Sequence, residues 1–174
     1  MFTTFNSVKK IVHGLGSISS IGEEVKRIGG SRVAIVTVKG LADIGLHETM
    51  CESLRKASIE FLVYDEAELE PNSRSIQQCA EKIIAFEADT LIGFGGGSAL
   101  DTAKAAAVLT SNEGPIENYF GLDMVKNPCM PMILVPTTSG TGSEMTSISV
   151  LTNDETGAKL GIVSDYLYAD LVIL

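Results

Sequence analysis

Three consecutive glycines at positions 95–97 follow a short apolar run and precede an alanine-rich stretch. This order predicts a strand, a tight turn and the start of a helix with one apolar face. Glycines at such a turn let a ligand approach the backbone closely, and the free N–H groups at a helix N-terminus attract anions. Ser98 is expected to cap the helix and to donate a hydrogen bond to a phosphate oxygen. The stretch therefore predicts a pyrophosphate site at Gly95, Gly96, Gly97 and Ser98.

Taken alone, this turn does not distinguish a ligand site from an ordinary strand-to-helix loop. Its spacing differs from G-x-G-x-x-G, and no Lys-Ser or Lys-Thr follows the glycines, which excludes a Walker-type loop. A second motif, residues 136–144, follows another apolar run, contains two glycines and is rich in hydroxyl side chains. It is either a polar surface turn ending in a cap at Ser143 or a second binding loop. Because parallel sheets bind ligands at the carboxyl ends of their strands, the pair of motifs favours a binding site.

The two motifs read Gly-Gly-Gly-Ser-x-x-Asp-x-x-Lys and Pro-Thr-Thr-Ser-Gly-Thr-Gly-Ser-Glu. At this spacing they resemble the iron-containing (group III) alcohol dehydrogenase family, and the resemblance runs nearly end to end. It implies hydride transfer between a small alcohol or aldehyde and NAD or NADP. A lyase of the dehydroquinate synthase type, a glycerol dehydrogenase-type enzyme and a non-catalytic nucleotide-binding module are the alternatives.

The resemblance also implies a fold and a domain organisation. The expected fold class is α/β: a Rossmann-like, mostly parallel sheet with flanking helices and an added β-hairpin, as in dehydroquinate synthase-like N-terminal domains. Residues 1–174 are then the nicotinamide dinucleotide-binding domain. In the family, one Asp and three His of a C-terminal helical domain bind Fe²⁺ or Zn²⁺. His13 and His47 match none of these positions, so no metal ligand and no catalytic residue is expected on this chain, which is expected to be inactive alone.

Individual cofactor contacts follow from the same resemblance. Asp101 is expected to reach the nicotinamide end, and Lys159 the nicotinamide ribose. The remaining expected contacts are Asn72, near the cofactor, and Thr137, Thr138 and Thr141, along the adenine and ribose. Simpler alternatives are that Asp101 is a first-turn acid favoured by the helix dipole, Asn72 a turn residue and Lys159 a solvated lysine. Lys104 is expected to be a surface partner of Asp101.

Cofactor choice is expected to depend on Val38. The family typically has an Asp here, within a Thr-Asp-Lys-Gly pattern, whose carboxylate binds the adenosine ribose and repels a 2′-phosphate. The present stretch is Thr37-Val38-Lys39-Gly40. Valine can neither bind the ribose nor repel the phosphate, and Lys39 could pair with it, so discrimination against NADP is expected to be weak or reversed. The alternative is that Val38 merely extends the strand and that selectivity is set elsewhere.

Composition limits the class of protein. A content of 45% hydrophobic and 20% charged residues fits one globular domain, and the net charge of −9 argues against nucleic acid or an anionic membrane as partner. Three scattered cysteines and the absence of a signal core or membrane-spanning run favour a cytoplasmic protein. A homo-oligomer is expected, because residues 172–174 and the side facing the missing domain should expose apolar surface. Exchange of an N-terminal hairpin is one possible route.

Strand-like and helix-like spacings of apolar residues alternate along the chain and predict the elements that support the two loops. A strand-rich hairpin around residues 153–157 ends this alternation, and the acidic stretch 65–70 is expected to be a solvated loop. His47 is expected to face solvent. The expected strands are 9–13, 32–38, 59–64, 90–95, 132–135, 147–152, 159–163 and 170–174, and the expected helices begin near Ser17, at Asp43 (ending at Ala57), after Ser73 and after Gly97, with 119–128 irregular.

Overall fold

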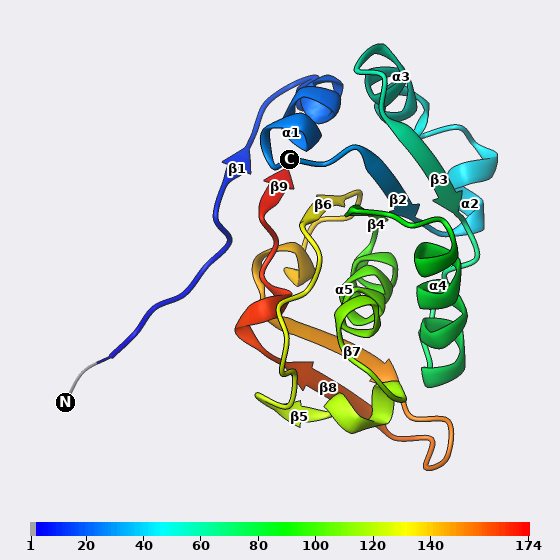
Figure 1. Cartoon of the computed structure of the whole chain (residues 1–174), viewed down its shortest axis with the longest axis vertical. Helices are drawn as coiled ribbons and strands as arrows, with labels where there is room; N and C mark the ends of the chain where they lie inside the picture. The colour runs from blue at the N-terminus through cyan, green and yellow to red at the C-terminus, as the bar shows by residue number, and fades with distance from the viewer. Residues whose placement is uncertain (1–2) are drawn as a thin grey trace.

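The computed structural model describes residues 3–174 as two sheets with helices packed against them (Figure 1). The larger sheet has six strands in the order β1-β9-β6-β4-β2-β3, and every pairing in it is parallel. The alternation of strands and helices therefore gives the predicted α/β sheet. Its strands are β1 (Ile11–Val12), β2 (Arg32–Val36), β3 (Glu60–Tyr64), β4 (Thr90–Gly95), β6 (Met132–Pro136) and β9 (Leu171–Ile173).

Helices cover both faces of this sheet. The α-helices are α1 (Ile21–Arg27), α2 (Lys39–Asp43), α3 (Glu48–Lys56), α4 (Ser73–Ala85) and α5 (Gly97–Ser111), and the 3₁₀ helices are η1 (Ser17–Ser20), η2 (Ile116–Tyr119), η3 (Ser143–Met145) and η4 (Asp165–Leu167). Alternate strand residues point to opposite faces. Ile35 of β2 packs with α1 and α3, whereas Ala34 of the same strand packs with α4 and α5. The near-continuous apolar runs in the strands arise because both faces are buried.

The second sheet lies against α5 on the side away from the large sheet (Figure 1). It contains β5 (Gly121–Leu122), β7 (Ile148–Thr152) and β8 (Lys159–Val163). Strands β7 and β8 form the predicted antiparallel hairpin, with Ile148 opposite Val163. Strand β5 pairs in parallel with β8, in a region where no strand was expected. Helix α5 is thus buried between two sheets, and its alanine-rich sequence permits close packing on both sides.

Several predicted elements differ in the structure. The helix expected at 43–57 begins only at Glu48, as α3, because Gly45 takes a left-handed φ of +67°; the short helix α2 before it was not expected. His47, at the start of α3, is only 8% exposed and does not face solvent. Glycines rather than serines occupy the N-cap positions of η1 and η3, namely Gly16 and Gly142.

The two chain ends also differ from expectation. Strand β1 does not form a hairpin but pairs in parallel with β9, and the segment before it extends away from the body (Figure 1). Of residues 172–174, Val172 and Ile173 are buried between β1 and β6, and only Leu174, at 43% exposed, supplies the apolar surface that we expected. The apolar character of the last strand reflects its burial within the sheet.

Candidate functional site

The glycine turn joins the carboxyl end of β4 to helix α5. Gly95 has a φ of +148°, and a Cβ atom there would lie 2.8 Å from the Ala99 Cβ, so only glycine fits. Gly96 is the N-cap residue, with φ −77° and ψ −175°, an extended conformation open to other residues. Helix α5 begins at Gly97, and its first N–H groups have no partner within the helix. The turn therefore presents donors and a positive dipole end at the carboxyl edge of the sheet.

The hydroxyl-rich loop after β6 lies directly beside this turn. The Thr137 N–H donates to the Gly95 carbonyl at 2.9 Å. A Cβ atom on Gly96 would lie 3.2 Å from the Thr138 Oγ1, and one on Gly97 would lie 3.4 Å from Thr141 side-chain atoms. The structure thus brings the three predicted threonines together with the three glycines, because β4 and β6 are neighbours in the sheet.

Ser98 does not have its expected role as a cap. Its hydroxyl donates to the Leu69 carbonyl at 2.5 Å, and no side chain caps the start of α5. The end of the acidic connector is therefore fastened to the first turn of α5. The connector is largely exposed, as predicted, but its last residues approach the glycine turn.

A cavity of about 240 Å³ opens beside the start of α5. It brings together four predicted site residues: Gly97, Ser98, Asp101 and Lys159. The Lys159 ammonium lies 3.5 Å from the Glu70 carboxylate, and both side chains are exposed. The other lining residues are Leu69, Glu70, Pro71, Val150, Leu151 and Thr152.

Asp101 points its carboxyl group toward the small sheet. The Val150 N–H donates to its Oδ2 at 3.2 Å, and its buried Oδ1 has no hydrogen-bond partner among the described residues. Burial raises the pKa of Asp101; the Val150 hydrogen bond, the Lys104 charge and the neighbouring Ser143 hydroxyl oppose this in part. Asp101, which also lines the cavity, thus has one carboxyl oxygen bound to the small sheet and one buried oxygen without a hydrogen-bond partner within residues 3–174.

Lys104 is not the surface residue that we expected. It is fully buried, and its ammonium donates to the carbonyls of Thr146 and Ile148 at 2.7 and 2.9 Å. Burial lowers its pKa to about 8, despite the nearby Asp101 and Glu144 carboxylates. The sequence position, one turn after Asp101 on an alanine-rich helix, gave no sign of the second sheet that covers this face.

Val38 and Asn72 lie outside the residues that line the cavity. Val38 follows β2, next to β4 in the sheet, and its backbone bridges to Glu66. Asn72 is the N-cap of α4 in a capping box: its side chain accepts from the Ser75 N–H at 2.9 Å and donates to Glu68. The Asn72 oxygen is therefore already engaged in the helix cap, which is the simpler of its two expected roles.

Sequence reasoning did not identify two stretches that line the cavity, residues 69–71 and 150–152. Both are ordinary in composition, and neither carries a recognisable motif. For residues 69–71, the only indication in the sequence was the length of the connector after β3, which lets Leu69 return to the start of α5. The second stretch is placed by the pairing of the hairpin against α5.

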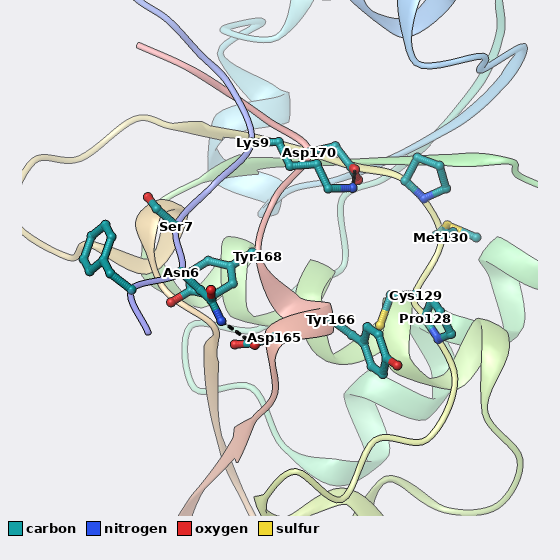
Figure 2. Close-up of a pocket in the computed structure, with 12 residues that line it drawn as sticks. Asn6, Ser7, Lys9, Pro128, Cys129, Met130, Asp165, Tyr166, Tyr168 and Asp170 are labelled. Atoms are coloured by element: carbon teal, nitrogen blue, oxygen red, sulfur yellow. Dashed lines mark hydrogen bonds and ion pairs between the residues drawn. The ribbon is translucent and has the colours of Figure 1, made fainter. Parts of the chain in front are cut away.

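A larger cavity of about 670 Å³ lies away from the glycine turn (Figure 2). It is formed by the extended N-terminal segment, the stretch 128–131 and the region of η4, where Asn6 donates to Asp165 and Lys9 pairs with Asp170. It contains none of the predicted site residues. We place the candidate site at the glycine turn because backbone donors, a helix N-terminus and the hydroxyl-rich loop lie together there, beside a cavity lined by Asp101 and Lys159.

Residues 3–174 contain neither a cluster of metal-binding side chains nor a membrane-spanning helix. Within that range, no group of three or more His, Cys, Asp or Glu side chains is arranged to hold a metal ion. The described residues therefore supply no ligand set for an iron ion. No helix in the described part combines the length and the apolar character needed to span a bilayer.

The structure is that of an α/β protein with a Rossmann-like parallel sheet and a glycine turn at the carboxyl end of a central strand, β4. Residues 8–174 match the family model described as iron-containing alcohol dehydrogenase. The chain therefore belongs to the iron-containing alcohol dehydrogenase family, as the two motifs indicated.

Relatives and solved structures support this assignment. A sulfoacetaldehyde reductase of Bilophila wadsworthia is 59% identical over 97% of this chain and 43% of its own length. A 1,3-propanediol oxidoreductase crystal structure aligns with a TM-score of 0.95 at 31% identity, over 99% of this chain and 45% of that one. A sulfoacetaldehyde reductase from Bifidobacterium kashiwanohense, solved in complex with NAD⁺, aligns with a TM-score of 0.88 at 30% identity, over 99% and 46%. The present chain thus spans less than half the length of these relatives.

Proposed function

We propose that this chain is the nicotinamide dinucleotide-binding domain of a metal-dependent alcohol dehydrogenase that transfers a hydride between an alcohol or aldehyde and NAD or NADP. The observation that carries the proposal is the backbone of Gly96 and Gly97 at the start of α5, where a Cβ atom would already lie 3.2–3.4 Å from side chains of the hydroxyl-rich loop. An uncharged cradle of N–H and hydroxyl donors suits a pyrophosphate on a chain whose net charge is −9.

The residues present fit a dinucleotide. Gly95, Gly96, Gly97 and Ser98 would supply the pyrophosphate turn; the Ser98 hydroxyl is already used, so its backbone N–H is the available donor. The threonines of the second loop would line the adenine and ribose, and Asp101 and Lys159 would lie toward the nicotinamide end of the cavity. When bound, the nicotinamide supplies the hydride chemistry, and this chain binds and orients it.

The pyrophosphate assignment is tested with Gly96→Val. The backbone at Gly96 is extended and tolerates valine, so the variant should fold. Its side chain would enter the space beside Thr138 and weaken binding of NAD⁺ by roughly 1–3 kcal/mol, the order of an overpacking penalty. Calorimetric titration of NAD⁺ into the purified chain measures this. Ala85→Val, at an exposed position of α4, is the control, and equal affinity of both variants would remove the assignment.

Cofactor choice is proposed to depend on Val38. Val38→Asp should weaken NADP relative to NAD, since a 2′-phosphate beside an unpaired carboxylate costs on the order of a few kcal/mol. Both cofactors are titrated at matched ionic strength into the parent chain and the variant. Glu66→Gln is the companion variant, because the Glu66 backbone bridges Val38 and could already supply the selecting carboxylate. A parent chain that prefers NAD by about two orders of magnitude, and keeps that preference in Glu66→Gln, would contradict this role for Val38.

The catalytic metal is proposed to be Fe²⁺ or Zn²⁺, bound by a C-terminal helical domain outside residues 1–174. The chain alone should then show no dehydrogenase activity with either metal added. The relative at 59% identity makes sulfoacetaldehyde the first substrate to assay with a full-length enzyme. Metal-dependent turnover by the verified 174-residue chain would contradict this division of labour.

Assembly and location are finer proposals. We infer a homo-oligomer, supported by exposed apolar side chains near the N-terminus, Phe5 and Leu15, and not by the buried C-terminal strand. Light scattering over a concentration series tests this, and a strictly monomeric species would count against it. The three unpaired cysteines support a cytoplasmic location.

A further inference from the structure

Lys104 is among the largest fully buried side chains in the described structure. Its ammonium group donates to the Thr146 carbonyl at 2.7 Å, to the Ile148 carbonyl at 2.9 Å and to the Thr146 hydroxyl at 3.2 Å. An ammonium group has three N–H donors, so this set satisfies it completely. The contacts reach the segment that follows η3, more than 40 residues along the chain.

Asp101 binds the same segment from one turn earlier on α5. Its backbone carbonyl accepts from the Ser149 hydroxyl at 2.8 Å, and its Oδ2 accepts from the Val150 N–H at 3.2 Å. Residues three apart on a helix lie on one face. Asp101 and Lys104 therefore fasten residues 146–150 to α5 along a single line of contacts. One end of this segment continues the hydroxyl-rich loop, and the other end lines the cavity.

Lys104 and its neighbours form a buried cluster of charged groups on one face of α5. The charged groups that face the Lys104 ammonium are Asp101 on α5 and Glu144 in η3, and both favour its charged form. Burial nevertheless dominates and lowers the pKa of Lys104 to about 8. One oxygen of each carboxyl, Asp101 Oδ1 and Glu144 Oε2, is buried without a partner among the described residues. Apolar side chains are often more stable than such a cluster, so the charge at Lys104 calls for another explanation.

We propose that Lys104 is a positioning residue for the nucleotide site, and that its protonated ammonium holds residues 146–150 on α5 so that Asp101 and the hydroxyl-rich loop are preset for the dinucleotide. This inference rests on the proposed function. Loss of the proton removes one donor from the three acceptors and leaves two carboxyl groups without their counter-charge. An anionic ligand is then bound less well, because the local negative charge rises.

The test combines affinity, pH and local exchange in the 174-residue chain. NAD⁺ is titrated by calorimetry between pH 7 and 9.5 into the parent chain, Lys104→Met and Lys82→Met, an exposed lysine on α4. In the parent chain and in Lys82→Met, the affinity should fall by roughly tenfold as pH rises through about 8. Lys104→Met should be weaker by a similar factor at pH 7 and should show a flat profile. If Lys104 only packs the helix, the affinities of the parent chain and of Lys104→Met should change with pH in parallel. That result would overturn the proposal.

Hydrogen exchange separates this proposal from the proposed function. Without nucleotide, backbone amides 148–150 should exchange faster in Lys104→Met than in the parent chain, while amides in α3 should not change. If the parent chain binds no NAD⁺, the proposed function fails. Unchanged exchange at 148–150 in Lys104→Met would instead overturn the proposal that Lys104 holds this segment on α5. If Lys104→Met does not fold, the pH profile of the parent chain decides, and a constant affinity from pH 7 to 9.5 overturns the proposal.

Discussion

The two loops of the candidate site both depend on glycine, but for different physical reasons. At the turn after β4, a Cβ atom on Gly95 would meet Ala99 at 2.8 Å and Leu41 at 3.3 Å, and the backbone φ is +148°. In the loop after β6, Gly140 and Gly142 have left-handed φ values of +99° and +69°, yet nothing lies within 4 Å of a Cβ placed on either. The first loop is closely packed, and the second is open.

This difference separates two uses of one residue type. The packed turn fixes where α5 begins relative to the sheet, so its backbone donors are aimed before any ligand arrives. The open loop is held mainly at its ends, by the Thr137 hydrogen bond to Gly95 and by Lys104 beyond η3. We therefore expect substitutions in the packed turn to cost more stability than substitutions in the open loop.

The largest expected effect is at the packed turn. Gly95→Ala should lower the free energy of unfolding by about 3 kcal/mol, since it adds both backbone strain and a clash with Ala99. Gly97→Ala is the matched control in the same motif, because its φ is ordinary and its closest contacts are 3.4 Å. Urea denaturation of both variants measures the difference. Equal stability of the two would show that the turn relaxes easily and is not a packed junction.

The next largest effect concerns Lys104, whose ammonium group binds the segment that follows the open loop. Burial lowers the pKa of Lys104 from 10.5 to about 8, so between these values the unfolded chain binds more protons than the folded chain. Stability from this group therefore rises with pH across that window. The difference in unfolding free energy between the parent chain and Lys104→Met should shift in the parent's favour by on the order of 2 kcal/mol.

Denaturation at pH 7.5 and pH 10.5 measures this shift. Buried thiols act in the opposite direction, because burial raises the pKa of Cys51 to about 11 and that of Cys129 to about 12. They are present in both proteins, so their contribution cancels in the difference. A difference that does not change with pH would mean that Lys104 titrates as in water.

The smallest expected effect is in the open loop. Gly142→Ala should cost about 1 kcal/mol, from the left-handed conformation alone. Gly142→Asn should recover part of this cost, because asparagine tolerates that conformation better than alanine does. Thermal unfolding of the three proteins measures the series. A cost that equals or exceeds that of Gly95→Ala would reverse the comparison between the loops.

Much of the architecture was predictable from the sequence because it depends on local periodicity. Apolar runs bounded by turn residues predicted the strands of the parallel sheet, and the turn at 153–157 predicted the hairpin of β7 and β8. The glycine turn and the threonines were also predictable as one site, since parallel strands end at the same edge of a sheet. The late start of α3 was missed although Gly45 marks it, because a single glycine is also tolerated inside a helix.

The sequence by itself therefore determined the strands of the sheet, the two loops of the candidate site and the family, because each follows from the spacing of residue types along the chain. Only the tertiary structure decided how polar side chains in those patterns are used. Ser98 donates to Leu69, 29 residues away, instead of capping its own helix, and Lys104 is bound to carbonyls 42 and 44 residues away. The physical reason is that burial and hydrogen-bond partners depend on which distant segments cover a helix face, and local spacing carries no record of them.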